Sequence, residues 1–258
     1  GCAQKALDPN INDATVRLLT RLGCDIVVAE GAGCCGALTH HMGKTDASPV
    51  SAAANTRAWM KEANGDGLDH VVINTSGCGT TVKDYGFMFR EDRDLAADAA
   101  TISGLAADIT EVLEKLAPKP TIDVPPLRVA SHSACSMQHG QKLSTLPPRL
   151  IESLGFTVEA VPESHICCGS AGTYNLLQPE LASRLQARKV TNIESLAPDL
   201  IAAGNLGCMI QIGQATGIPV VHTVELADWA TGGPKPAALS KIAARQRQPD
   251  DYIIDTAA

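Results

Sequence analysis

A cysteine pattern that occurs twice constrains this chain more than any other feature of its sequence. In each copy, one cysteine is followed after 31 residues by a vicinal Cys-Cys pair and a glycine, and a later Gly-Cys step closes the copy. Equal gaps of this length indicate an internal duplication, in which both copies form the same structural unit. The first copy holds Cys2, Cys34, Cys35 and Cys78, and the second holds Cys135, Cys167, Cys168 and Cys208.

The sequence around the cysteines repeats as well. The ten residues that end at Glu30, RLGCDIVVAE, match the eleven that end at Glu163, SLGFTVEAVPE. Both glutamates precede a Cys-Cys pair, where we expect them to position the loop rather than to act in acid/base chemistry. The match also places Phe156 opposite the ninth cysteine, Cys24, which is therefore predicted to be a small buried apolar side chain and not a ligand.

Hydrophobic periodicity predicts the same order of elements in both copies, an α/β fold with small, mainly parallel sheets flanked by helices. Each copy has an amphipathic helix, a strand that runs into the Cys-Cys loop, a second helix and a second strand before its last cysteine. Side chains that follow parallel strands gather at the carboxyl edge of a sheet, so each set of cysteines is expected to converge. The predicted helices are 10–22, 49–64, 144–154 and 179–195, and the predicted strands are 25–29, 70–75, 157–161 and 199–203.

Two tandem, pseudo-symmetric domains are expected, one over residues 1–119 and one over 120–258, because each copy is long enough to bury a core. Residues 117–126 (APKPTIDVPP) contain four prolines and are predicted to form the linker. The Ala-rich residues 94–116 before it are predicted to form a helix that carries no ligands.

The second copy begins with a predicted strand over residues 127–132 that leads to Cys135. The matching strand of the first copy would precede Gly1, so we expect the first domain to lack its opening strand. The sequence also begins without an initiator methionine. We therefore expect it to be a piece of a longer protein.

Composition excludes several classes of function. The net charge of −7 argues against a nucleic-acid-binding surface. The apolar runs are much shorter than the roughly 20 residues that a membrane-spanning helix needs. Nine cysteines in a large chain without a secretion signal favour metal binding or catalysis over a disulfide framework, and hence a reducing, cytoplasmic compartment.

Thiolates are soft ligands that suit zinc, copper(I) and iron–sulfur clusters, and each copy offers four of them. The spacing differs from the CxxC-type knuckles of structural zinc sites and from the cysteine run of ferredoxins, whereas a vicinal pair can bridge neighbouring metals in a cluster. Structural zinc in at least one copy, a dithiol/disulfide role for the Cys-Cys pairs and an inert core role remain alternatives.

Histidines are a weaker signal than the cysteines. Histidine can bind a metal or tune it through hydrogen bonds. For each histidine an ordinary loop position is the favoured interpretation, and only His132 and His165 lie close enough to the cysteines to be candidates. No Ser-His-Asp arrangement, phosphate-binding glycine loop or paired-carboxylate site stands out. The histidines near the cysteines are His40, His41, His132, His139 and His165.

The pattern Cys-x31-Cys-Cys-Gly…Gly-Cys resembles the cysteine-rich CCG domain. That domain is shared by heterodisulfide reductase, lactate-utilisation iron–sulfur proteins, anaerobic glycerol-3-phosphate dehydrogenase and the iron–sulfur component of glycolate oxidase. Residues 30–43 (EGAGCCGALTHHMG), 75–86 (TSGCGTTVKDYG) and 167–182 (CCGSAGTYNLLQPELA) are most similar to the last of these. The resemblance covers essentially the whole chain.

The resemblance implies an oxidoreductase subunit that transfers electrons from an FAD-bearing partner, which oxidises glycolate to glyoxylate, towards quinone or another membrane acceptor. It implies an iron–sulfur cluster, of the 4Fe-4S type, in at least one domain, and a position peripheral to the inner face of the membrane. All eight repeated cysteines would be the cluster ligands. A related CCG redox subunit, or a zinc-stapled interaction module, is the alternative.

Two departures from the family pattern matter. The fullest family motif ends in CxxC, whereas Thr81 and Gln211 stand where each second cysteine would be. The two-part cluster of heterodisulfide reductase therefore does not transfer directly, and a non-cysteine ligand remains open. In addition, nothing here matches the N-terminal ferredoxin-like region of glycolate-oxidase-type members.

Overall fold

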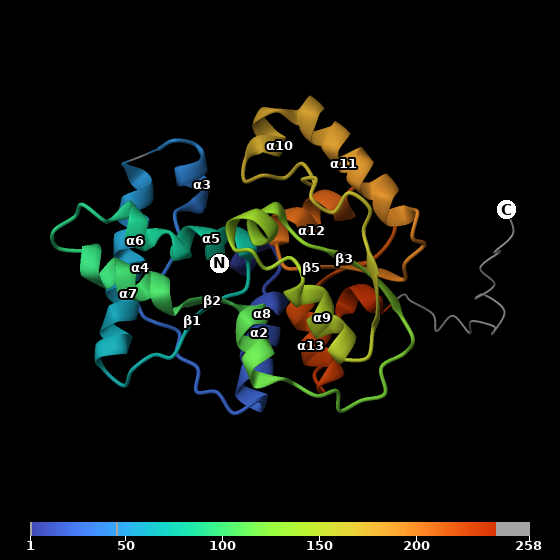
Figure 1. Cartoon of the computed structure of the whole chain (residues 1–258), viewed down its shortest axis with the longest axis horizontal. Coiled ribbons are helices and arrows are strands. Elements are labelled where there is room, and N and C mark those ends of the chain that lie inside the picture. The colour runs from blue at the N-terminus through green and yellow to red at the C-terminus, as the bar shows by residue number, and fades with distance from the viewer. Residues whose placement is uncertain (1, 45, 241–258) are drawn as a thin grey trace, which may run out of the picture.

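The computed structural model describes residues 2–44 and 46–240 of the chain. Figure 1 shows the first copy on the left and the second on the right, with helices around the strands. The elements of the first copy are α1 (Cys2–Leu7), α2 (Asn10–Arg21), α3 (Ala37–His41), α4 (Ala47–Asn64), β1 (Val71–Ile73), α5 (Ser76–Lys83), α6 (Tyr85–Met88), α7 (Ala96–Leu105), β2 (Ala106–Asp108) and α8 (Ile109–Leu116).

The second copy follows the proline-rich residues 117–126, which form no helix or strand, as predicted for a linker. Its elements are β3 (Arg128–His132), the π-helical turn η1 (Ser136–Gly140), α9 (Leu146–Ser153), β4 (Thr157–Ala160), α10 (Tyr174–Leu177), α11 (Pro179–Glu194), β5 (Leu200–Ala203), α12 (Leu206–Gly213), β6 (Val220–His222), α13 (Thr223–Ala230) and the 3₁₀ turn η2 (Ala237–Leu239).

Both sheets are parallel, which confirms the predicted α/β class. The second copy has four strands in the order β4-β3-β5-β6, and the first has the pair β1-β2. β1 and β2 are the counterparts of β5 and β6, since each pair of strands flanks a helix whose third residue is the last cysteine of its copy. The carboxyl ends of the strands in each sheet therefore point towards the cysteines.

The predicted strand over residues 25–29 is wrong, because these residues form no strand. In the second copy the equivalent β4 is hydrogen-bonded to β3. Among the described residues of the first copy, the position of β3 is taken by no strand and Cys2–Leu7 is helical, so residues 25–29 have no strand to pair with. Val27 and Val28 are consequently exposed, at 52% and 81%.

The predicted single helix over residues 94–116 is also wrong. A buried strand, β2, separates α7 from α8 and pairs in parallel with β1. Asp108 ends this strand and caps α8, since its carboxylate accepts from the Thr110 N–H while Glu111 accepts from the Asp108 N–H. This reciprocal cap is a strong helix start, so the chain begins a new helix there.

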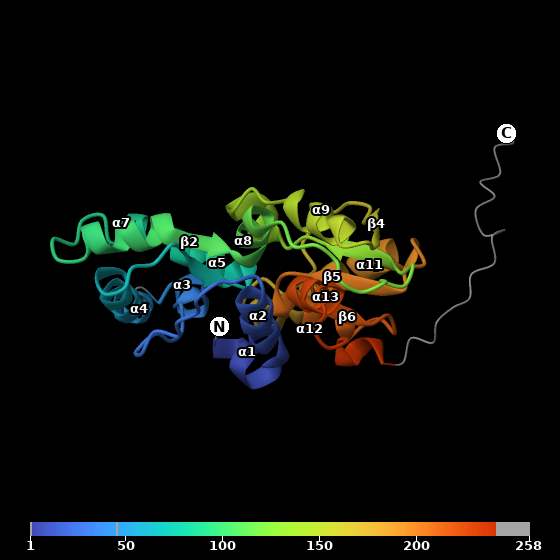
Figure 2. The same ribbon diagram turned by 90° about the horizontal axis from the view of Figure 1, so that it is seen from below.

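The two copies share one buried apolar cluster, and each copy also has a cluster of its own. Ile11 and Leu18 of α2 are fully buried in a cluster with Leu226 and Trp229 of α13 in the second copy. α2 therefore packs against the other copy, and Figure 2 shows it next to α12 and α13. The domain boundaries of 1–119 and 120–258 stay a prediction, and the core between the copies crosses them.

Ion pairs at this interface follow the duplication. Arg17 of α2 contacts Asp228 of α13 at 2.7 Å, and Arg149 of α9 contacts Glu114 of α8 at 3.3 Å. Both arginines stand five residues before the Leu-Gly step that ends their helix. Each copy thus sends the same helix and the same arginine to the other copy. The pairs differ in burial, because Asp228 is 1% exposed and also binds Arg21, whereas Glu114 is half exposed.

We expect Asp228→Ala to lower the free energy of unfolding by about 1–3 kcal/mol, because it leaves two partly buried guanidinium groups without their carboxylate. Its counterpart Glu114→Ala is the matched control and is expected to cost about 0–1 kcal/mol, since exposed pairs contribute little. Urea unfolding of both variants measures this difference. Equal costs would show that burial of the pair does not matter.

Candidate metal centres

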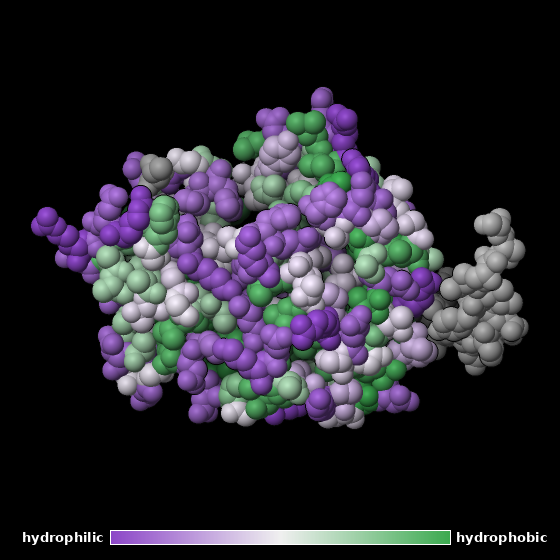
Figure 3. Space-filling view, viewed as in Figure 1, coloured by the Kyte–Doolittle hydropathy of each residue, from purple (hydrophilic) through white to green (hydrophobic). Residues whose placement is uncertain are grey.

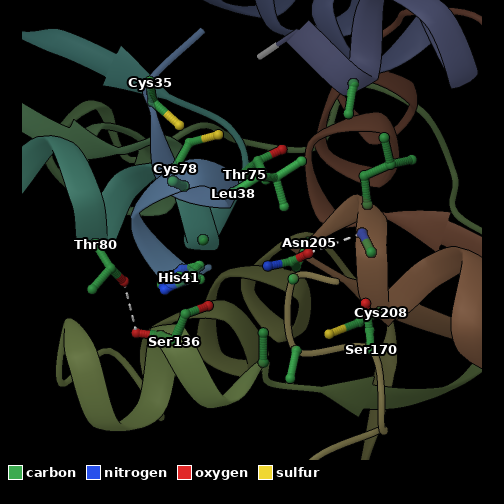
Figure 4. A pocket seen from close by; sticks show the side chains of 18 of the residues that line it. Cys35, Leu38, His41, Thr75, Cys78, Thr80, Ser136, Ser170, Asn205 and Cys208 are labelled. Carbon is green, nitrogen blue, oxygen red and sulfur yellow. Dashed lines mark hydrogen bonds between the residues drawn. The ribbon is translucent and has the colours of Figure 1, made fainter. Parts of the chain in front are cut away.

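The eight repeated cysteines gather around one cavity of about 670 Å³ between the two copies. Seven of them line the cavity, and the eighth, Cys168, is buried at 1% exposure. Figure 4 shows Cys35 and Cys78 on one side with their sulfur atoms turned towards each other, and Cys208 on the opposite side. The predicted convergence of each set is confirmed, and the two sets also face a common space.

The last cysteine of each copy lies after a strand, in the first turn of the next helix. Cys78 and Cys208 are each the third residue of an eight-residue helix, α5 and α12. The free N–H groups of a first helical turn favour a nearby negative charge, so both sulfur atoms lie where a thiolate is stabilised.

Each Cys-Cys pair is followed by a glycine whose backbone conformation allows the loop to pack closely. Gly36 and Gly169 have φ of +81° and +94°, the left-handed region that favours glycine. A Cβ atom would lie 2.9 Å from the Ser48 carbonyl oxygen at the first glycine and 2.4 Å from that of Ala182 at the second. These glycines therefore let each loop approach the following helix, α4 or α11.

The same backbone hydrogen bond to sulfur forms in both loops. The N–H of Gly36 donates to the Cys34 sulfur at 3.5 Å, and the N–H of Gly169 donates to the Cys167 sulfur at 3.3 Å. Donors of this kind stabilise a thiolate. The first cysteine of each pair is therefore prepared to act as an anionic ligand.

In the first copy two of the thiols lie as close together as two ligands of one metal ion would. The sulfur atoms of Cys2 and Cys34 are 3.5 Å apart, close to the spacing of about 3.8 Å for two sulfurs on one tetrahedral metal at 2.3 Å. A hydrogen bond with Cys78 and burial raise the pKa of Cys35, and the same bond lowers the pKa of Cys78. Burial raises the pKa of Cys2.

The second copy shows the same alternation in a more buried setting. Hydrogen bonds within the set raise the pKa of Cys135 and Cys168 and lower that of Cys167, while a bond with Cys168 lowers the pKa of Cys208 to about 6. Four packed thiols can thus lose only some of their protons unless a cation joins them. The donor set fits a metal ion or a metal–sulfur cluster.

Different residues support the two Cys-Cys loops. In the first copy, buried Asn55 of α4 accepts from the Gly33 N–H at 2.7 Å and donates to the Cys34 carbonyl at 3.0 Å, and Tyr85 donates to the Cys35 carbonyl at 2.8 Å. In the second, the fully buried Lys189 of α11 donates to the Glu163 carbonyl at 3.0 Å. A neutral amide and a buried lysine, whose pKa burial lowers, therefore hold the two loops.

A polar seam joins the copies beside the cavity. The Ser76 and Ser136 hydroxyl groups are 2.8 Å apart, and the Asn205 amide donates to Ser76 at 2.9 Å. Thr80 donates to the Ser136 carbonyl at 3.2 Å, drawn as a dashed line in Figure 4. Sequence reasoning missed these residues, since serine and threonine beside a cysteine carry no distinctive signal. The seam holds the two cysteine sets in fixed relative positions.

The remaining candidates lie mostly outside the cysteine sets. Cys24 packs against the shared apolar cluster, but it is half-buried and not fully buried as predicted. His41 and His139 line the cavity, and burial lowers the pKa of His41. The loop interpretation holds for exposed His165 but is wrong for His132, which is 4% exposed and lies among the second set of thiols.

The two glutamates and His40 lie away from the cysteine sulfurs. Glu30 is exposed. Glu163 forms an ion pair with Arg188 and accepts from Asn192 at 2.9 Å, and Arg188 lowers the pKa of Glu163 to about 2. Glu163 therefore positions its loop, as predicted. His40 is exposed on α3, and its ring centroid lies 6.0 Å from that of its neighbour His41.

Comparison with known proteins agrees with this geometry. Residues 1–83 and 129–213 match the cysteine-rich domain family CCG. The chain belongs to this family, in two tandem copies. It is 39% identical to the glycolate oxidase iron-sulfur subunit of Escherichia coli and 28% identical to the probable one of Bacillus subtilis, over 89% and 90% of this chain.

These two relatives are longer than this chain, which spans 56% and 54% of their length. The chain is also 28% identical to lactate utilization protein A of Geobacillus thermodenitrificans, over 84% of this chain and 91% of that protein. Among residues 2–44 and 46–240, no helix is both long enough and apolar enough to cross a membrane.

We expect Cys35→Ala and Cys168→Ala each to remove roughly half of the metal bound by the anaerobically purified chain, because each takes one ligand from a different set. Cys24→Ala is the matched control and is expected to keep all of it. Metal analysis by mass spectrometry, normalised to protein, gives the result. Equal metal loss in the Cys24 variant would mean that the two sets are not the binding sites.

Proposed function

We propose that this chain is an iron–sulfur electron-transfer subunit of a glycolate-oxidising complex. It would receive electrons from an FAD-bearing partner that oxidises glycolate to glyoxylate and pass them towards a quinone-type acceptor. The observation that carries the proposal is the pair of four-cysteine sets around one cavity, joined with the similarity to proteins named glycolate oxidase iron-sulfur subunits.

The cysteines fit iron–sulfur clusters in number, softness and spacing. Cys2, Cys34, Cys35 and Cys78 would hold one cluster, and Cys135, Cys167, Cys168 and Cys208 the other. When bound, such clusters accept and donate single electrons. The protein supplies the thiolates, donates the Gly36 and Gly169 N–H groups to sulfur, and lines the cavity with mainly apolar surface.

An electron-transfer role is favoured over a zinc-stapled module by the shared cavity. A structural zinc site needs only its four ligands and gains nothing from a second site across an open space. Electron transfer requires centres that lie near each other and near a surface. The seam of Ser76, Ser136 and Asn205 holds the two sets in such an arrangement.

The rim of the cavity supports contact with a partner. Leu7, Leu38 and Ile210 line the cavity and are exposed at 63%, 41% and 37%. Leu176 and Leu177 of α10 are also exposed, and Figure 3 shows apolar residues at the surface in the upper part of the molecule, where α10 lies in Figure 1. We propose that the flavin-bearing subunit covers this rim, at the cytoplasmic face of the membrane.

Analysis of anaerobically purified protein tests the proposal. We expect iron and acid-labile sulfide in comparable amounts, and an EPR signal that grows on reduction. Cys168→Ser should reduce the visible absorbance and slow reduction of the acceptor, because a hydroxyl is a poor ligand for iron. Stoichiometric zinc without iron would overturn the electron-transfer role and favour the zinc-stapled module.

The buried Lys189 gives a second test. A positive charge near a cluster stabilises its reduced, more negative form. We therefore expect Lys189→Met to lower the reduction potential of the second centre, measured by an EPR-monitored redox titration at equal iron content. The control is Lys61→Met, which removes an exposed lysine from the equivalent helix α4 and should leave both potentials unchanged. An unchanged potential in the Lys189 variant would contradict the assignment.

A further inference from the structure

A buried histidine lies among the thiols of the second copy. One imidazole nitrogen of His132 and the sulfur atoms of Cys168 and Cys208 all lie within 4.8 Å of one another. The three residues are 4%, 1% and 5% exposed. Among residues 2–44 and 46–240, no other group of three such side chains comes this close together.

The sheet places His132 there. It is the last residue of β3, and its Cα pairs with that of Ala203 at the end of β5. Three residues after His132 the chain reaches Cys135, and five residues after Ala203 it reaches Cys208. β3 and β5 are neighbouring parallel strands, so His132, Cys135 and Cys208 all lie at the same carboxyl edge of the sheet.

The polar neighbours of this imidazole are thiols. Its Nε2 atom is buried and pairs with no oxygen or nitrogen atom of the described residues, and the imidazole interacts with the Cys208 thiol, whose pKa it helps to lower. A buried polar atom without such a partner costs free energy, so native proteins rarely leave one in place without a ligand, water or ion. His222 is also buried, but it caps α13 by accepting from the Val224 N–H at 3.1 Å, has a hydrogen bond with the backbone of Asn74 and joins no thiol cluster.

We propose that His132 is a ligand of the second metal centre, a fifth protein donor beside Cys135, Cys167, Cys168 and Cys208. The inference deepens the proposed function and rests on the presence of metal at this site. Neutral imidazole nitrogen binds both iron and zinc, so it is a suitable donor beside thiolates. No proton leaves the ring if its free nitrogen binds the metal.

The proposal makes the two centres chemically unlike. The first set consists of four thiols, and among the described residues no histidine, including the cavity-lining His41, forms such a close group with two of them. An imidazole ligand is neutral where a thiolate is negative, and imidazole ligation raises the potential of an iron–sulfur centre. The second centre would therefore be the better electron acceptor of the two.

Pulsed EPR on the reduced protein tests the ligand. We expect the hyperfine coupling of a directly bound nitrogen, which changes to that of nitrogen-15 when the protein is grown with nitrogen-15-labelled histidine. His132→Cys should keep the iron but lose this coupling and lower the potential of the second centre. The control is His165→Ala, a change at an exposed histidine two residues before the Cys-Cys pair, which should keep the coupling.

The outcomes separate this inference from the proposed function. Iron-containing wild-type protein without a bound-nitrogen coupling, or a coupling that persists in His132→Cys, would overturn the role of His132 alone. Zinc without iron would overturn the electron-transfer role. In that case X-ray absorption at the zinc edge still decides the inference, since His132 as a ligand predicts a nitrogen neighbour that His132→Ala removes.

Discussion

The exchange of helices between the two copies is the contact on which the rest of the structure depends. α2 of the first copy packs on α13 of the second, while α9 of the second packs on α8 of the first. Apolar residues from both copies form one buried cluster, with Phe156 and Trp229 rings 6.0 Å apart within it. Because burial of apolar area is the main source of folding free energy, separating the copies would expose this core. The interface thereby makes one cavity from two half-sites.

The two cysteine sets show why this fold suits metal binding. Parallel strands, helix N-termini and two left-handed glycines bring four sulfur atoms together in each copy. Without a cation, packed thiols must share their protons, as the opposite pKa shifts of Cys35 and Cys78 show. A bound metal releases those protons, so metal affinity and folding are coupled to pH.

The α/β class and the convergence of the cysteines could be predicted from the duplication alone. Equal gaps aligned the two copies, and strand ends then predicted where the cysteines converge. The failures have physical causes. Residues 25–29 have a strand-like sequence, but a strand needs a partner, and the described part of the first copy offers none. β2 is only three residues long, too short for periodicity to separate it from helix, although the capping pair Asp108 and Glu111 marked the break. His132 resembled a loop histidine because burial depends on strand register, which the sequence does not state.

The residues around the two cysteine sets differ, and this difference would affect the potentials of the two proposed centres. If both sets were surrounded alike, two identical centres would have equal potentials, and no free energy would drive an electron from one to the other. The structure surrounds them differently. The first Cys-Cys loop is held by the neutral Asn55 and Tyr85, and the second by the buried Lys189, whose pKa is lowered by burial and raised by the nearby thiolates. Positive charge beside a centre stabilises its reduced form. Under the proposed electron-transfer function, the duplication would supply two sites on one cavity, and the different supporting residues would favour transfer from the first copy to the second.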